Sequence, residues 1–310
     1  MRDHLLRYFD ISWFSSKDGP GIRTVLFLQG CHLRCPWCHS PQSWEESSPL
    51  MFFESRCLFC GACVAVCPNN VHYIDNHKHH INRTACQRCG VCIKSCPVSR
   101  NAKWNTGALG LSGIIIKTSE LFELLKPQLE LLKKIGGLTV SGGEPLLQFE
   151  PLADLLTMCK SEGFHTVVET SASIPRKNIE SIITLVDRWL IGLRPTAVKN
   201  DQIVTIGNWE QIVNNLEFLA AQDTGNISIR IPIIPGYTDK RGGIRKINEL
   251  MKMFKIPTVE ILPYNLLTSH YYKASGITFA LVDTAPTKKP GLARIRNYFA
   301  VQGFDAKIIE

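Results

Sequence analysis

Eleven of the twelve cysteines in this chain fall into three tight groups, a spacing that indicates metal chemistry. The first group, Cys31, Cys35 and Cys38, has the spacing C-x3-C-x2-C in the stretch QGCHLRCPWCHSP. A closed structural metal site normally uses four protein ligands. Three thiolates can instead bind three irons of a [4Fe-4S] cube and leave the fourth iron open to a small molecule. A zinc site completed by His32 or His39 is the alternative.

The other two groups repeat the pattern C-x2-C-x2-C-x3-C-P at residues 57–68 and 86–97. Bacterial two-cluster ferredoxins use this run, and the last cysteine of each run ligates the other cluster. We therefore assign one [4Fe-4S] cluster to Cys57, Cys60, Cys63 and Cys96. A second [4Fe-4S] cluster is assigned to Cys86, Cys89, Cys92 and Cys67. Two zinc sites are the alternative, although zinc usually uses two spaced pairs.

Three further features bear on metal binding and location. The segment HKHH, with His77, His79 and His80, could bind metal or tune a potential, but a solvated loop is the simpler interpretation. Cys159 lies alone on the apolar face of an expected helix, as a buried and inert thiol would. No apolar run approaches the roughly 18 residues of a membrane span, and the N-terminus lacks the features of a signal peptide. We therefore expect a cytoplasmic protein without membrane contact.

The formal net charge of +8 first suggests a nucleic acid or an acidic partner. The charges of three clusters would remove about 5 of those positive charges, because metal centres must be counted with the protein. The chain also has no dense run of Lys and Arg with interleaved aromatic residues. We therefore expect no nucleic-acid binding.

Apolar strand-like runs alternate with amphipathic helical segments around these groups. The expected strands are 22–29, 136–141, 164–171, 187–194, 226–234 and 258–264. The expected helices are 118–135, 149–163, 177–186, 208–223 and 243–254. This order predicts an α/β fold with a parallel sheet, a partial (β/α)6 TIM-like barrel made from residues 1–45 and 107–310. Residues 46–106 are expected to form an inserted α+β domain like a bacterial ferredoxin.

A β/α barrel places its chemistry at the carboxyl ends of its strands. The distinctive residues of this chain lie at those ends: Cys31, Glu144, Glu169, Arg194, Arg230 and Tyr264. In SGGEP, Gly142 and Gly143 let the backbone approach a ligand closely, and Glu144 can accept a hydrogen bond from an ammonium group.

The cysteine triad directly after a strand, with Trp37 before its last member and SGGEP after the next strand, resembles the radical S-adenosylmethionine (SAM) superfamily. The resemblance implies that the methionine amino and carboxylate groups of SAM chelate the open iron. One electron then breaks the sulfonium C–S bond, and the 5′-deoxyadenosyl radical abstracts a hydrogen atom. It further implies that Glu144 meets the SAM amine and that Trp37 and His39 adjoin the adenosyl group.

A narrower resemblance covers essentially the whole chain. The stretches DGPGIR, VSGGEPLLQ, FHTVVETS, IRIPIIPGYTD and VEILPYN resemble glycyl-radical-enzyme activating enzymes with a ferredoxin-like insertion, of the pyruvate formate-lyase activating type. It implies an oxidoreductase that abstracts hydrogen from a backbone glycine of a partner glycyl radical enzyme in an anaerobic setting. It also implies a monomer reduced by flavodoxin or ferredoxin. The residues implied to hold the partner's glycine loop are Asp18, Gly19, Pro20, Gly21 and Arg23; a simple Gly-Pro-Gly turn is the alternative.

The chain departs from that family at four positions that would contact SAM. Ser40 stands where the family has Asn, and Asn265 stands where it has His. Gly192 and Arg194 replace an Asp-x-Lys pair whose Asp is implied to bind a monovalent cation. Gly192 has no ligand atom, so we hypothesise that Arg194 replaces the cation. An atypical or weakened activase is the alternative.

Other polar residues complete the SAM site that the resemblance implies: Glu169, Thr170 and Arg230. Two other functions remain open at this point. One is radical SAM chemistry on a small molecule, and the other is an iron–sulfur electron carrier whose barrel is only a scaffold. The two clusters of the insertion could relay electrons to the open cluster or serve as a docking surface.

Overall fold

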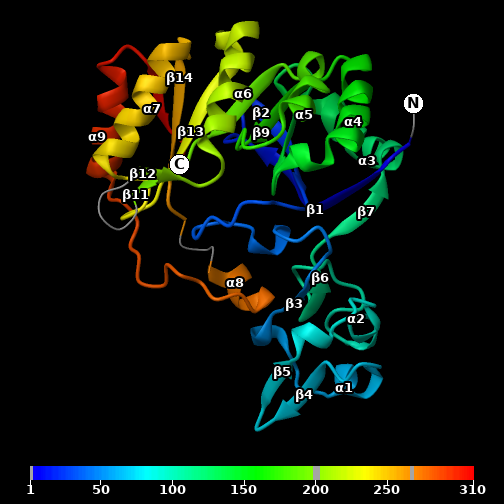
Figure 1. Cartoon of the computed structure of the whole chain (residues 1–310). Helices are drawn as coiled ribbons and strands as arrows, with labels where there is room; N and C mark the ends of the chain where they lie inside the picture. The colour runs from blue at the N-terminus through cyan, green and yellow to red at the C-terminus, as the bar shows by residue number, and fades with distance from the viewer. Residues whose placement is uncertain (1–2, 198–202, 266–268) are drawn as a thin grey trace.

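A mixed nine-stranded sheet forms the centre of the protein in the computed structural model, which describes residues 3–197, 203–265 and 269–310. Its strand order is β15-β14-β13-β10-β9-β8-β2-β1-β7, and it stays open at both edges (Figure 1). The strands from β15 to β2 run parallel, whereas β1 runs antiparallel to both of its neighbours, β2 and β7. The bounds are β1 (Leu5–Ser15), β2 (Ile22–Leu28), β7 (Ile114–Lys117), β8 (Gly136–Gly142), β9 (His165–Thr170), β10 (Arg188–Gly192), β13 (Ile227–Ile233), β14 (Thr258–Pro263) and β15 (Asp305–Ile308).

The α/β class and the parallel sheet expected from the sequence are confirmed, and all six expected strands are present. The sheet contains one more parallel strand, β15, which pairs with β14. It also contains β1, which pairs with β2 on the side away from β8. Neither strand is a continuous apolar run, because charged residues such as Arg7, Asp10 and Lys307 interrupt them, so the pattern of a buried strand is missing.

Helices pack against the sheet and supply the other half of the core (Figure 1). Their bounds are α3 (Thr118–Leu132), α4 (Phe149–Ser161), α5 (Arg176–Glu180), α6 (Trp209–Gln222), α7 (Arg241–Phe254) and α9 (Lys289–Ala300). Pro127 lies inside α3 without ending it. The helix expected at 177–186 is instead split into α5 and a short 3-10 turn at Ile183–Leu185. The β-branched sequence Ile182–Thr184 explains this break, since such side chains lose rotamer freedom in a helix. Buried Cys159 in α4 agrees with the expectation from the sequence.

A small cysteine-rich lobe lies beyond the sheet, at the bottom of Figure 1. It is closed by the antiparallel pair β3 (Leu50–Phe52) and β6 (Leu109–Leu111). Within it lie α1 (Ala62–Val66), the hairpin of β4 (His72–Asp75) and β5 (Lys78–Ile81), and α2 (Val91–Ser95). The lobe has its own apolar cluster, which includes buried cysteines. We call residues 50–111 the cysteine-rich lobe.

The C-terminal part of the chain returns to the lobe through α8 (Ser269–Ser275). Ala274 of α8 packs with Met51 and Phe53, and its carbonyl oxygen accepts a hydrogen bond from Arg83 at 2.8 Å. The lobe is therefore held from two sides. Within the described residues, no helix has both the length and the apolar character needed to cross a bilayer.

Candidate functional site

The cysteine triad, Cys31, Cys35 and Cys38, lies on a loop that starts at the carboxyl end of β2 and closes back on it. The side-chain amide of Gln29 donates to the carbonyl oxygens of Gln42 at 2.8 Å and Glu45 at 2.7 Å. The N–H of Gly30, at φ +96, donates to the carbonyl oxygen of Ser43 at 2.8 Å. This clamp fixes both ends of the loop and so presents the triad at one place.

The three thiols are free and packed together in an apolar setting. Burial raises the pKa of Cys31 to about 12, with a further contribution from the charge of Glu144. Burial also raises the pKa of Cys38 to about 11 and that of Cys35 above its usual value. Thiolates are costly at this site unless a cation compensates their charge, so the donor set fits a metal cluster.

The residues next to the triad differ in exposure. Trp37 is 4% exposed and packs edge-on against Tyr237, with ring centroids 5.5 Å apart. His39 is exposed, whereas Ser40 is half-buried and donates its backbone N–H to Cys38 Sγ at 3.4 Å. Trp37 thus supports the loop from the interior, and His39 is the neighbour that faces outward.

Glu144 is 2% exposed and is held by donors from the end of β9. Thr170 donates its hydroxyl to Oε1 at 2.7 Å. Ser171 donates both its backbone N–H, at 2.9 Å, and its hydroxyl, at 2.6 Å, to Oε2. The carboxylate is therefore fixed beside Cys31. Ser171 was not among the expected site residues, although it continues the polar stretch ETS after a buried strand.

Gly142 and Gly143 bring the end of β8 against the cysteine loop. A Cβ on Gly143 would lie 2.1 Å from the carbonyl oxygen of Gly30 and 3.1 Å from Cys31 Cβ. Gly142 has φ +123, and a Cβ there would lie 2.2 Å from the backbone nitrogen of Leu28. Both glycines therefore let the end of β8 lie close to the backbone of the cysteine loop and β2. This contact places SGGEP next to the triad.

Arg194 lies beyond the end of β10, and its guanidinium covers Gly192. Its Nη1 donates to the carbonyl oxygen of Gly192 at 2.5 Å. A Cβ on Gly192 would come within 2.8 Å of both terminal nitrogens. Burial alone would lower the pKa of Arg194, but the nearby Cys35 and Glu169 more than offset this and raise it.

The residues at this position do not fit a monovalent cation. Gly192 offers no side-chain ligand, its carbonyl oxygen already accepts from Arg194, and a guanidinium charge lies next to it. Glu169, a further oxygen donor, accepts from Arg230 at 3.1 Å and from Ser141 at 2.7 Å. The protein itself thus supplies a positive charge beside the Gly192 carbonyl oxygen.

Arg230 connects the sheet to the loop before β2. It is 3% exposed and forms ion pairs with Glu260 at 2.7 Å, Glu169 at 3.1 Å and Asp18 at 3.3 Å, and it also donates to the carbonyl oxygen of Lys17. Burial tends to raise the pKa of Glu169, but Arg230 and a hydrogen bond from Ser141 lower it overall. Glu260 is not among the site residues expected from the sequence. A charged residue inside an otherwise apolar strand is the signal that could have identified it as part of the site.

The DGPGIR stretch forms an exposed turn above that ion-pair network. Pro20 and Gly21 are exposed, and Gly19 and Gly21 have φ of +122 and +71. Arg23 is instead fully buried and donates to Thr139 Oγ1 at 3.0 Å and to the carbonyl oxygen of Pro20 at 3.5 Å. Arg23 therefore supports the turn from beneath and does not form part of its surface.

Two residues after β14 complete the edge of the sheet. Tyr264 is 4% exposed and packs in the apolar cluster of the triad. Asn265 is exposed and follows directly. Because β2, β8, β9, β10, β13 and β14 run parallel, the residues at or after their carboxyl ends lie at the same end of the sheet.

The cysteine-rich lobe holds two small cavities, each lined by four cysteines. One, which we call the Cys57 cavity, is lined by Cys57, Cys60, Cys63 and Cys96. The other, which we call the Cys67 cavity, is lined by Cys67, Cys86, Cys89 and Cys92. These are the two sets expected from the ferredoxin-like runs, and the thiols are all free. Four converging thiols suit an iron–sulfur cluster.

The solvated-loop interpretation of HKHH is wrong for one of its histidines. His77 is exposed, but His79 is only 8% exposed and lines the Cys57 cavity. Its ring lies edge-on against Phe52, with centroids 4.5 Å apart. Burial lowers the pKa of His79, and burial together with His79 lowers the pKa of His72 to about 4. The alternation of the β5 strand turns His79 inward, which the loop interpretation did not consider.

Known proteins have sequences that match nearly the whole length of this chain. A family model described as a 4Fe-4S single cluster domain matches residues 17–203. The (2S)-3-sulfopropanediol dehydratase activating enzyme of Klebsiella oxytoca is 32% identical, over 95% of this chain and 94% of the relative. The benzylsuccinate synthase activating enzyme of Thauera aromatica is 34% identical, over 90% of this chain and 86% of the relative. The indoleacetate decarboxylase activating enzyme of Tractidigestivibacter scatoligenes is 29% identical, over 95% and 94%.

Among solved structures, a domain of pyruvate-formate lyase-activating enzyme from Bacteroides vulgatus aligns with a TM-score of 0.43 and 23% identity. The alignment covers 56% of this chain and 98% of that domain. The names of these sequence relatives all describe enzymes that activate a partner enzyme, and the matches cover nearly the whole chain. The chain belongs to the radical SAM family of glycyl-radical-enzyme activating enzymes.

Proposed function

We propose that this activase binds SAM at the carboxyl edge of the sheet and uses it to abstract hydrogen from a glycine held beside the DGPGIR turn. An iron–sulfur cluster on Cys31, Cys35 and Cys38 would, when bound with SAM, supply reductive C–S cleavage and a 5′-deoxyadenosyl radical. The observation that carries this proposal is the Arg230 network. One buried guanidinium ties Asp18 of the exposed turn to Glu169 beside the triad.

The SAM carboxylate pairs with Arg194 in this proposal. The guanidinium is buried near Cys35, carries its own charge and can meet a carboxylate with two parallel N–H groups. Glu144 supplies the negative charge for the SAM ammonium group, and Thr170 and Ser171 hold it in place. No monovalent cation is needed, because Arg194 already provides the positive charge.

The adenosyl part of SAM would lie along the outer side of the triad. His39, Ser40 and Asn265 offer polar groups there, and Gly142 and Gly143 complete the seat by holding the end of β8 against the cysteine loop. Trp37 acts from the interior by fixing the loop against Tyr237. These residues bind and orient SAM and exclude water from it.

The partner's glycine loop would lie on the exposed turn. Asp18, Gly19, Pro20 and Gly21 form its surface, and Arg23 holds the turn from beneath. Gly19 and Gly21 let the turn lie close against Val167 and Ile135, and this packing presents the exposed Pro20 and Gly21 to a partner backbone.

The sheet and the cysteine-rich lobe have different roles in this proposal. Residues 1–45 and 107–310 would form the radical SAM partial barrel, and residues 46–106 a ferredoxin-like insertion with two [4Fe-4S] clusters. The four-cysteine lining of each cavity supports this assignment. The insertion would take electrons from flavodoxin or ferredoxin and pass them to the cluster on the triad, with the chain acting as a monomer.

The test uses anaerobically reconstituted protein with SAM, a reductant and the glycyl radical enzyme encoded next to its gene. We expect 5′-deoxyadenosine to form and the partner to gain the electron paramagnetic resonance (EPR) doublet of a glycyl radical. 5′-Deoxyadenosine without a doublet on any such partner would instead indicate a small-molecule substrate. If no 5′-deoxyadenosine forms, the remaining interpretation is an iron–sulfur electron carrier.

A further inference from the structure

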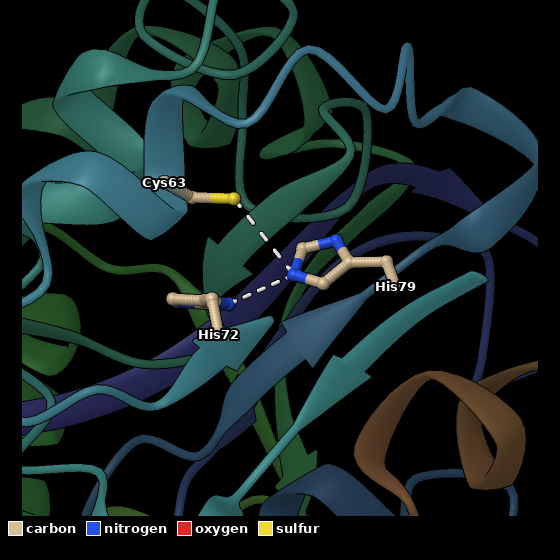
Figure 2. Close-up of side chains that lie close together, drawn as sticks. All are labelled: Cys63, His72 and His79. Atoms are coloured by element: carbon tan, nitrogen blue, oxygen red, sulfur yellow. Dashed lines mark hydrogen bonds between the residues drawn. The ribbon is translucent and has the colours of Figure 1, made fainter. Parts of the chain in front are cut away.

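Two buried histidines join the two cavities of the cysteine-rich lobe. His79 lines the Cys57 cavity, and His72 lines the Cys67 cavity. Their rings meet between the cavities, with His72 Nδ1 and His79 Nε2 3.0 Å apart (Figure 2). They are 3% and 8% exposed, respectively. A single hydrogen bond therefore reaches from the wall of one cavity to the wall of the other.

The β4–β5 hairpin produces this arrangement. His72 begins β4 and pairs with Ile81, whereas His79 lies in β5 opposite Ile74. The two histidines therefore lie on the same face of a two-stranded ribbon, near enough for their rings to meet. The tight turn at Asn76 and His77, both at positive φ, fixes that register.

Both nitrogens of the His79 ring also lie near cysteine sulfurs. Its Nδ1 lies 3.6 Å from Cys57 Sγ, and its Nε2 lies 3.8 Å from Cys63 Sγ (Figure 2 draws the latter contact). Both cysteines belong to the four that line the Cys57 cavity. A cysteine sulfur bound to iron carries no proton and can only accept a hydrogen bond.

The shorter of the two sulfur contacts, the one to Cys57, favours one arrangement of protons. A hydrogen bond to Cys57 places the His79 proton on Nδ1, which leaves Nε2 as the acceptor for the Nδ1–H of His72. His72 Nε2 then carries no proton. That atom is buried and has no hydrogen-bond partner among the described residues, as suits a nitrogen without a hydrogen to place. The pair thus delivers one N–H toward the Cys57 cavity.

A single metal ion on Cys63, His72 and His79 is the competing interpretation, because their ligand atoms all lie within 4.8 Å of one another. It would remove Cys63 from the set of four and break the 3.0 Å contact between the rings. Both losses count against it, and the metal content of the protein distinguishes the two.

We propose that His79 tunes the iron–sulfur centre of the Cys57 cavity by donating a hydrogen bond to its cysteine ligand, and that His72 is the positioning residue that fixes the His79 proton for this purpose. A hydrogen bond to a ligand sulfur stabilises the more negative, reduced state and so raises the reduction potential. The centre of the Cys57 cavity accepts an electron more readily than it would without His79. The inference rests on the proposal above that both cavities hold [4Fe-4S] clusters.

The test is an EPR-monitored redox titration of the reconstituted full chain, with iron and zinc measured for each variant. The cluster on the triad is recognised because its signal changes when SAM is added. His79→Phe removes the donor, so one of the two other potentials should fall while the second stays and the iron content is unchanged. His80→Ala is the matched control, since His80 lies on the opposite face of β5, stacked on Tyr73. It should shift neither potential.

Two conservative variants separate the hydrogen bond from mere filling of space. In His79→Asn the amide nitrogen takes the place of Nδ1, so the potential should return toward that of the wild type. In His79→Gln the amide lies near the position of Nε2. This variant keeps the contact with His72 but loses the hydrogen bond to Cys57. Its potential should fall as in His79→Phe. His72→Leu should lower the same potential by a smaller amount.

Each remaining outcome overturns one specific claim. Unchanged potentials in His79→Phe and His79→Gln at full iron content would overturn the tuning role of His79. Loss of a cluster in both the Asn and Gln variants, with His80→Ala intact, would make His79 a ligand instead. Stoichiometric zinc bound beside fewer irons would favour the single-metal site. Wild-type protein that assembles no clusters in the lobe would overturn the function proposed for the lobe, separately from this inference.

Discussion

The guanidinium of Arg194 occupies the space that a side chain on Gly192 would fill. A Cβ on Gly192 would meet Nη1 and Nη2 at 2.8 Å each, and Nη1 donates to the Gly192 carbonyl oxygen at 2.5 Å. The two departures from the family pattern are therefore linked, since the small residue at 192 makes room for the large cation at 194. Arg194 thereby places a positive charge beside the Gly192 carbonyl oxygen, as the role proposed for it requires.

Replacing Arg194 by Ala should weaken SAM binding while the iron content stays complete. Loss of a buried charge partner costs about 3 kcal/mol, or roughly 100-fold in affinity. Lys at 194 should recover part of the loss, because it restores the charge without the planar pair of donors. Equilibrium binding of SAM to the reconstituted protein measures the effect.

The control for that change is Arg188→Ala, at the opposite end of the same strand, where the guanidinium contacts Ser228 Oγ at 3.0 Å. It should leave SAM affinity unchanged. Full SAM affinity in Arg194→Ala would contradict the role given to this side chain.

Gly192→Ala should also weaken SAM binding, although Ala adds a single methyl group. That methyl group displaces the guanidinium from its seat, so the Arg194 charge no longer points at the same place. In an Arg194→Ala background the same change should cost almost nothing, because the clash has been removed. A double-mutant cycle on SAM affinity measures this coupling, and simple additivity would count against the linkage.

The elements that the sequence reveals are those whose pattern is local. The strands expected at 136–141 and 226–234 are present as β8 and β13, which are buried over almost their whole length, and the two ferredoxin-like runs specify their cysteine sets by spacing alone. The chemistry of the triad is likewise readable from three residues and the strand before them. Local patterns suffice here because three cysteines of each set lie within a few residues of one another and the fourth comes from the matching repeat.

The contacts that the sequence does not reveal join residues that are far apart in the chain. Ser171 meets Glu144 across two strands, and Arg230 meets Asp18 across 212 positions. These pairs depend on the register of parallel strands, which is set by the packing of the whole sheet. The solvated loop expected for HKHH places His79 in solvent, whereas the hairpin register turns it inward.

Glu144→Gln should lower both SAM affinity and stability. The carboxylate accepts from Thr170 and Ser171 on both oxygens, so an amide nitrogen would face a donor. A lost hydrogen bond to a charged group costs about 1–3 kcal/mol of unfolding free energy. SAM affinity should fall as well, since the negative charge opposite the ammonium group disappears. Anaerobic urea unfolding and equilibrium SAM binding measure the two effects.

Ser171→Ala separates these two effects. It removes one donor to Glu144 but keeps the charge, so stability should fall while SAM affinity is largely retained. Equal SAM affinity in Glu144→Gln and the wild type would show that this carboxylate is structural only.

Asp18→Asn should reduce activation of the partner and leave SAM cleavage intact. The change removes the charge that pairs with Arg230 at 3.3 Å, while the amide can still accept from Ser15 Oγ. Such a partly exposed ion pair contributes about 1 kcal/mol, so we expect roughly a fivefold loss in the rate of glycyl radical formation. The measurement compares the EPR doublet on the partner with 5′-deoxyadenosine released when the partner is absent. A matching decrease in both products would show that Asp18 acts on SAM and not on the glycine loop.

Cys89→Ala should interrupt electron delivery from a protein reductant. Cys89 is an exposed member of the Cys67 cavity, so its loss should remove one cluster, about one third of the iron, and little of the fold. SAM cleavage driven by flavodoxin should then slow, whereas cleavage driven by dithionite should persist, because a small reductant can reach the triad directly. Cys159→Ala, a change at a buried thiol in α4, is the matched control and should retain both rates. Unaffected delivery from flavodoxin in Cys89→Ala would exclude the relay and leave the lobe as a docking surface.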